Sequence, residues 1–172
     1  MNGQPDHTTY YLLPTTGNGL YLHIPFCLSK CSYCDFASYP QGRLPEGVSI
    51  VRYVDALIAE IGLRSESAGA MRCDTIYFGG GTPSLLPTDD IARITSALRG
   101  AFGLSGLREF TLEANPDTLT SEKLKAWREL GIHRLSIGIQ SLQDGTLLLL
   151  GRTYTSKTAL TILEDLKEEL SS

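Results

Sequence analysis

The 172-residue chain lacks any hydrophobic run long enough to cross a membrane. Its longest unbroken run of leucines covers only residues 147–150, whereas a spanning helix needs about 20 apolar residues. Lysine and arginine are missing from the first 29 positions, although secretory and mitochondrial targeting segments need basic residues there. We therefore expect no membrane span and a cytoplasmic protein.

Basic charge is also scarce. The sequence has 15 lysines and arginines against 19 aspartates and glutamates, a net charge of −4 at pH 7. A protein held on nucleic acid by bulk charge needs the opposite balance, so we expect no nucleic-acid partner. With 42% hydrophobic and 20% charged residues, the composition is that of a globular chain, long enough for one domain or part of a larger one.

Cysteine is rare and clustered. Of the four cysteines, Cys27, Cys31 and Cys34 fall within eight residues, and Cys73 stands apart. A disulfide framework would spread its cysteines along the chain, and a reducing cytosol would not keep it oxidised. We therefore interpret the clustered thiols as metal ligands.

Short β-rich segments alternate with segments of helical period. Strands are expected at residues 20–24, 75–78, 109–113 and 134–139. Helices are expected around residues 50–61, 91–98 and 124–130 and from about 156 to the end, capped by Ser49, Thr88 and Thr120, with Gly131 just past the third. This order predicts an α/β fold with a parallel sheet over residues 19–172, preceded by a loose lead-in at 1–18.

The predicted strands do not alternate cleanly between apolar and polar residues, which suits strands covered on both sides or lining a barrel. The unusual residues follow the ends of these strands. The cysteines follow the first strand, the glycines at 79–81 the second, and Glu113 and Gln140 end the third and fourth. Because the carboxyl ends of parallel strands share one edge, we expect all four groups to meet at one mouth.

The spacing Cys27-x3-Cys31-x2-Cys34 suits an iron–sulfur cube with one open iron. Three thiolates on a tight loop reach three corners, whereas full ligation by cysteine needs a fourth. Cys73 precedes the second strand, at the opposite end of the sheet, and we expect it to be a buried apolar filler. Two alternatives stay open, a zinc ion held by the three cysteines and His23, and thiols without a metal.

Six short motifs, two of which contain Cys27 and Cys34, resemble those of a known family. The match is to the radical S-adenosylmethionine (SAM) superfamily, in the branch of the oxygen-independent coproporphyrinogen III oxidases and their heme-chaperone relatives. The motifs that carry it are residues 21–27 (YLHIPFC) with 34–36 (CDF), 79–85 (GGGTPSL), 113–116 (EANP), 136–141 (SIGIQS) and 150–152 (LGR).

The resemblance implies a partial radical SAM (β/α) barrel with about four of six strand–helix units. It implies a [4Fe–4S] cluster on Cys27, Cys31 and Cys34 whose open iron chelates SAM, and cleavage of SAM to a 5′-deoxyadenosyl radical in porphyrin or heme metabolism. An electron donor such as flavodoxin or ferredoxin is implied too. The residues that match SAM contacts of the family are Tyr21, Tyr33, Gly79, Gly80, Gly81, Thr82, Glu113, Gln140 and Arg152.

The sequence departs from the family at two positions and in its length. The oxidases proper carry a further cysteine two residues after the third ligand, where this chain has Phe36, and the sequence Cys-Asp-Phe resembles the chaperone branch. A heme chaperone without oxidase activity is therefore the alternative. Tyr154 is typical of neither branch.

The chain is also less than half as long as full members of the family. We expect a fragment without strands five and six, weak or inactive as an enzyme. Its last strand would be an open edge, and an apolar face of the sheet would be uncovered.

Overall fold

The computed structural model describes residues 17–69 and 72–171. The strands are β1 Gly19–Ile24, β2 Phe26–Cys27, β3 Tyr39–Pro40, β4 Thr75–Gly80, β5 Glu109–Ala114 and β6 Arg134–Ile137. The helices are α1 Ile50–Ala68, α2 Thr88–Ala101, α3 Ser121–Glu129, α4 Asp144–Leu149 and α5 Ser156–Ser171. Short 3₁₀ turns lie at Gln41–Arg43, Pro83–Leu85 and Pro116–Thr118. In the described ranges no helix is both long and apolar enough to span a bilayer.

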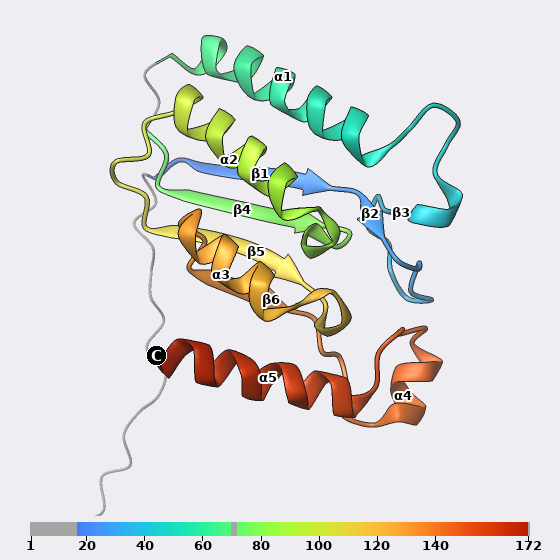
Figure 1. The fold of residues 1–172 in the computed structure, drawn as a ribbon. Helices are drawn as coiled ribbons and strands as arrows, with labels where there is room; N and C mark the ends of the chain where they lie inside the picture. Colours follow the sequence, from blue (N-terminus) through green and yellow to red (C-terminus); the bar gives the residue numbers. More distant parts are fainter. Residues whose placement is uncertain (1–16, 70–71, 172) are drawn as a thin grey trace, which may run out of the picture.

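The main sheet has four parallel strands in the order β1-β4-β5-β6, which confirms the α/β prediction. Helices α1, α2 and α3 lie on one face of this sheet, and α5 runs beside β6 (Figure 1). A second, two-stranded parallel sheet pairs β2 with β3 and closes the cysteine loop. Both β1 and β6 are edge strands, as expected for the last one.

Two of the three predicted helix caps are confirmed. The Ser49 hydroxyl accepts from the backbone N–H of Arg52, and Thr120 accepts from Lys123 in the same way. Thr88 is wrong as a cap, because it is the first residue of α2 and Pro87 occupies the cap position without a side-chain bond. The acidic residues of the first turn of α2 still face the positive end of its dipole.

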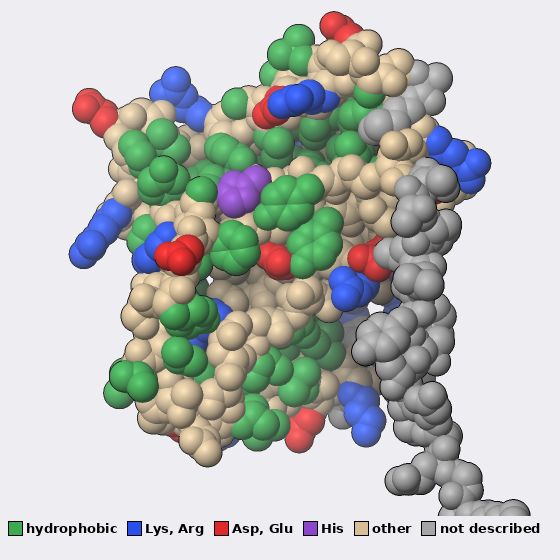
Figure 2. All heavy atoms as spheres, turned by 180° about the vertical axis from the view of Figure 1, so that it is seen from behind, with side chains coloured by type: hydrophobic (Ala, Val, Ile, Leu, Met, Phe, Trp, Pro, Cys, Tyr) green, Lys and Arg blue, Asp and Glu red, His purple; other side chains and the backbone are tan. Residues whose placement is uncertain are grey.

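The expectation of an uncovered apolar sheet face is wrong, because apolar and polar side chains do alternate along the strands. Even-numbered positions of β1, β4 and β5 point to the helices, and odd-numbered positions point away. The open face instead carries the polar or amphipathic side chains Tyr21, His23, Tyr77, Thr111, Glu113, Arg134 and Ser136. Figure 2, seen from behind, shows a histidine and acidic side chains among the hydrophobic ones. The pattern was blurred in the sequence because tyrosine and histidine combine an apolar ring with a polar tip.

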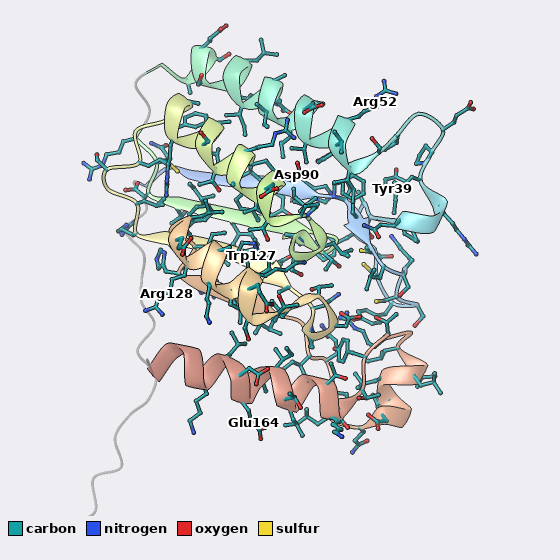
Figure 3. All side chains as sticks on the ribbon, viewed as in Figure 1. Tyr39, Arg52, Asp90, Trp127, Arg128 and Glu164 are labelled. Carbon is teal, nitrogen blue, oxygen red and sulfur yellow. The ribbon has the colours of Figure 1, made fainter. Side chains whose placement is uncertain are left out.

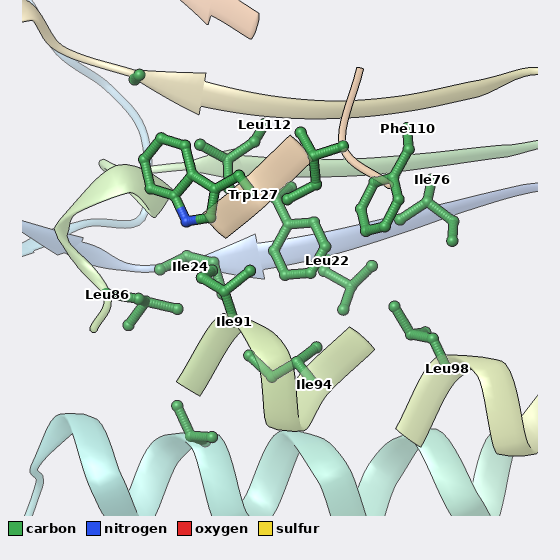
Figure 4. Packing of buried hydrophobic residues seen from close by; sticks show 14 of the residues in the cluster. Leu22, Ile24, Ile76, Leu86, Ile91, Ile94, Leu98, Phe110, Leu112 and Trp127 are labelled. Carbon is green, nitrogen blue, oxygen red and sulfur yellow. The ribbon is translucent and has the colours of Figure 1, made fainter. Parts of the chain in front are cut away.

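The hydrophobic core lies between the sheet and its helices. Trp127 points inward from α3, whereas Glu164 on α5 points away from the core (Figure 3). The rings and branched side chains of the strands interdigitate with those of α2 (Figure 4). Cys73 is fully buried at the amino end of the sheet, as expected, and burial raises the pKa of its thiol.

Three further expectations need adjustment. The fourth strand ends at Ile137, two residues earlier than predicted, and α4 forms where no helix was expected. Residues 1–16 of the predicted lead-in lie outside the described residues. Asn18, at its end, is already held to the sheet, since its backbone N–H donates to the Asp74 carboxylate at 3.1 Å.

Candidate functional site

A cavity of about 350 Å³ opens at the carboxyl ends of the four main strands. Its walls come from the cysteine loop and from the segments that follow β4, β5 and β6. Ten of the twelve residues expected at the site line it: Cys27, Cys31, Cys34, Tyr33, Gly80, Gly81, Thr82, Glu113, Gln140 and Arg152. The structure thus brings together residues as far apart in the sequence as Cys27 and Arg152.

Tyr21 and Gly79 do not line this cavity. The Tyr21 ring stacks on Tyr77 with 5.9 Å between ring centroids, and a Cβ on Gly79 would meet both rings within 2.9 Å. Tyr77 in turn donates to Glu113 Oε1 at 2.6 Å. Burial and then the Glu113 charge raise the pKa of Tyr21. The two stacked tyrosines therefore lie behind the cavity and contact it only through the hydrogen bond from Tyr77 to Glu113.

Glu113 is held at both carboxylate oxygens. Oε1 accepts from Tyr77, and Oε2 accepts from the backbone N–H of Gly80 at 3.0 Å. Gly80 needs to be glycine here, because its φ is +115° and a Cβ would lie 2.6 Å from the His23 ring. Gly80 therefore lets the backbone pack against the His23 ring, and its N–H fixes the direction of the Glu113 carboxylate.

The cysteine loop presents three half-buried thiols. The loop is pinned at its far end, since the backbone N–H of Tyr39 donates to Pro25 O at 2.7 Å. His23 Nε2 lies 2.8 Å from Ala37 O, and its Nδ1 lies 3.4 Å from the Tyr21 hydroxyl. Both nitrogens of His23 are thus engaged away from the thiols, which disfavours the zinc alternative.

All three thiols of the cysteine loop line the cavity. Among the described residues, no three potential ligands are placed to hold one metal ion. A mononuclear zinc site needs such a placement, whereas a cubane offers its irons at separate corners and takes one thiolate at each. The donor set of three thiols around one cavity fits a cubane that takes one thiolate at each of three corners.

Arg152 has donors to spare at the cavity. Nη1 donates to Asn115 Oδ1 at 3.1 Å and Nη2 donates to the Tyr33 hydroxyl at 2.7 Å. Its Nε is buried and has no partner within the described part of the chain. Nη1 and Nη2 each carry a second N–H, and a guanidinium that lines a cavity with such donors fits a ligand carboxylate. Burial raises the pKa of Tyr33, although the Arg152 charge acts in the opposite direction.

Gln140 lies at the exposed rim, three residues past the end of β6. Its φ of +67° is unusual for a residue other than glycine and marks a strained turn. The buried Tyr154 holds this turn, because its hydroxyl lies 2.7 Å from Gly138 O and also donates to Ile139 O. Sequence reasoning noted Tyr154 only as atypical and so missed this positioning role.

Asn115 was also missed as a site residue, since it stood only as one letter of the motif at 113–116. Its side chain bonds Thr82 and Arg152, and its backbone N–H donates to Ser84 Oγ at 3.4 Å. Strand position is the signal that identifies it, because Asn115 directly follows β5 at the functional edge. A polar residue that directly follows a strand at this edge is therefore a candidate for the site.

Comparison with known proteins settles the family. The family model described as the radical SAM superfamily matches residues 21–171. The chain belongs to the radical SAM superfamily. It is 40% identical over 146 residues to the radical S-adenosyl methionine domain-containing protein 1, mitochondrial, of Bos taurus, covering 85% of this chain and 32% of that protein.

Two further relatives fall in the expected branch of the superfamily. The heme chaperone HemW of Lactococcus lactis is 38% identical over 151 residues, which cover 88% of this chain and 38% of that protein. The solved structure of coproporphyrinogen III oxidase (HemN) from Escherichia coli superposes with a TM-score of 0.77 at 28% identity, over 87% of this chain and 34% of that one. The chain thus spans about a third of the length of these relatives. Membership in the superfamily implies a [4Fe–4S] cluster and SAM.

Proposed function

We propose that this chain is the cluster- and SAM-binding part of a radical SAM protein of porphyrin or heme metabolism, similar to the coproporphyrinogen III oxidases. The observation that carries the proposal is the convergence of Cys27, Cys31 and Cys34 with Glu113 and Arg152 on one cavity. A bound [4Fe–4S] cluster would supply the electron that cleaves SAM to methionine and a 5′-deoxyadenosyl radical.

The residues of this chain would bind the cluster and SAM and orient them relative to each other. The three thiolates would hold the cluster and leave one iron open to SAM. Arg152, which lines the cavity, would pair with the SAM carboxylate through the second N–H of Nη1 and Nη2, and Glu113 would accept from the ammonium or a ribose hydroxyl. Gly80, Gly81 and Gln140 would line the rest of the SAM site. Flavodoxin or ferredoxin as electron donor and a cytoplasmic location remain predictions.

Anaerobic reconstitution with iron and sulfide, followed by EPR of the reduced chain, tests this proposal. We expect a [4Fe–4S]⁺ signal that changes when SAM is added. Cys27→Ala should lose the cluster, whereas the matched control Cys73→Ala should keep it, because Cys73 is buried at the opposite end of the sheet. An intact signal in Cys27→Ala, or one indifferent to SAM, would contradict the proposal.

A heme chaperone without oxidase activity is the second candidate. The favouring observation is Phe36, which stands where the oxidases carry a further cysteine and lines the cavity with 59% of its surface exposed. The relatives named heme chaperone are also closer in sequence than the solved oxidase. Heme transfer to an acceptor without porphyrin decarboxylation would favour this candidate, and turnover of coproporphyrinogen would exclude it.

A further inference from the structure

The thiol of Cys27 receives a hydrogen bond from a neighbouring strand-end loop. The Thr82 hydroxyl donates to Cys27 Sγ at 3.6 Å, within the longer range that sulfur acceptors allow. Thr82 is buried, and its backbone N–H donates to Phe26 O at 2.7 Å. A Cβ on Gly81 would lie 3.0 Å from the same sulfur, so the loop packs directly against it. The contact between hydroxyl and sulfur is therefore built into the packing.

A chain of donors sets the direction of that hydroxyl. Arg152 Nη1 donates to Asn115 Oδ1 at 3.1 Å, and since a guanidinium only donates, the amide oxygen of Asn115 must face it. The amide nitrogen then faces Thr82 Oγ1 and donates to it at 3.3 Å. With its oxygen accepting from Asn115, the single hydroxyl proton of Thr82 is left to point at Cys27 Sγ.

Asn115, the middle member of this series of hydrogen bonds, is held by the turns that follow β4 and β5. Thr118 Oγ1 donates to Asn115 O at 2.7 Å, and Lys123 Nζ donates to both Ser84 O and Thr118 O. Burial lowers the pKa of Lys123, as expected for an ammonium enclosed by these turns. These contacts hold the backbone of Asn115, so its side chain starts from a fixed position beside Thr82 and Arg152.

We propose that Thr82, oriented by Asn115 and Arg152, is a positioning residue that hydrogen-bonds the Cys27 thiolate and raises the reduction potential of a cluster bound there. The inference rests on the proposed function. A donor at a ligating sulfur draws charge from it and so favours the more negative, reduced cluster. Removing the hydroxyl should make the cluster harder to reduce.

The test is a redox titration of the reconstituted chain, with the EPR signal of the reduced cluster as the readout. Thr82→Val removes the hydroxyl at nearly constant volume. We expect the equilibrium constant for one-electron reduction to fall about threefold to tenfold, or about 28 to 59 mV at 59 mV per tenfold. Thr82→Ser keeps a hydroxyl and should restore the wild-type potential, which a purely structural role would not predict.

Asn115→Ala provides a second, independent measurement. It leaves the Thr82 hydroxyl in place but removes its orienting donor, so the potential should fall in the same direction by a smaller factor. Equal potentials in the wild type, Thr82→Val and Asn115→Ala would overturn this inference alone. Failure of the wild-type chain to take up any cluster would overturn the proposed function, and the inference with it.

Discussion

The two faces of the main sheet are held by different forces. On the helix side, Ile24, Ile76, Phe78 and Leu112 are fully buried among the apolar side chains of the helices. On the open side, tyrosine, glutamate and arginine side chains bond one another across neighbouring strands, as Tyr77 does with Glu113. Strand periodicity lets one segment serve both faces, because successive side chains point in opposite directions.

The difference separates stability from chemistry. Burying one large apolar side chain contributes about 1.5–3 kcal/mol, whereas a partly exposed hydrogen bond contributes about 0.5–1.5 kcal/mol. The helix side thus holds the strands in place, and the open side fixes the directions of polar groups near the cavity. Substitutions at adjacent positions of one strand should therefore have different consequences.

The largest effect is expected at Phe78. Its ring is fully buried and stacks on Phe110 with 5.7 Å between centroids, so Phe78→Ala leaves a cavity in the core. We expect the free energy of unfolding to fall by about 3–5 kcal/mol, measured by urea denaturation followed by circular dichroism. Tyr21→Ala on the open face is the matched control and should lose only about 1 kcal/mol, the value of its ring stacking. Equal losses would remove the distinction between the faces.

A smaller effect is expected for Tyr77→Phe, next to Phe78 but on the other face. The variant loses the hydroxyl that donates to Glu113 at 2.6 Å, which should lower the free energy of unfolding by about 1.5 kcal/mol at neutral pH. Burial, and then the hydrogen bond to Glu113, raises the pKa of Tyr77 above 10.0.

The sign of this pKa shift gives the pH dependence. A group whose pKa is raised on folding stabilises the protein fully below its unfolded pKa, and that stabilisation is lost as the pH rises through the folded pKa. The wild type and Tyr77→Phe should therefore differ most at neutral pH and converge in alkaline solution. Urea titrations over this range measure the difference, and a gap that stays constant or widens at high pH would count against the proposed bond.

Much of this architecture was predictable because its causes are local. Four strand segments were placed by their β-rich composition, and the caps at Ser49 and Thr120 by their position before a helical period. The meeting of the cysteines with Gly80 and Gln140 followed from the topology alone, since parallel strands place their carboxyl ends along one edge.

The rest depends on contacts that no short window contains. Strands β2 and β3 have two residues each, too few to show a period, and α4 is a single six-residue helix. Asn115 bonds partners that lie 31 to 37 residues away in the sequence, so only the folded sheet reveals its central position. Thr88 failed as a cap because the preceding turn brings the chain into the helix one residue earlier, at Pro87.

The smallest effect is expected for the ion pair of the open face. Arg134 Nη1 lies 3.4 Å from Glu109 Oε1, and both side chains are well exposed, so water and salt screen the attraction. Glu109→Gln should lower the free energy of unfolding by less than about 1 kcal/mol, and the loss should shrink as salt is added. A cycle with Arg134→Met, measured by urea denaturation at low and high salt, isolates the pair. A coupling as large as the effect of Phe78→Ala would mean that the open face also holds the fold together, because exposed pairs alone do not reach that energy.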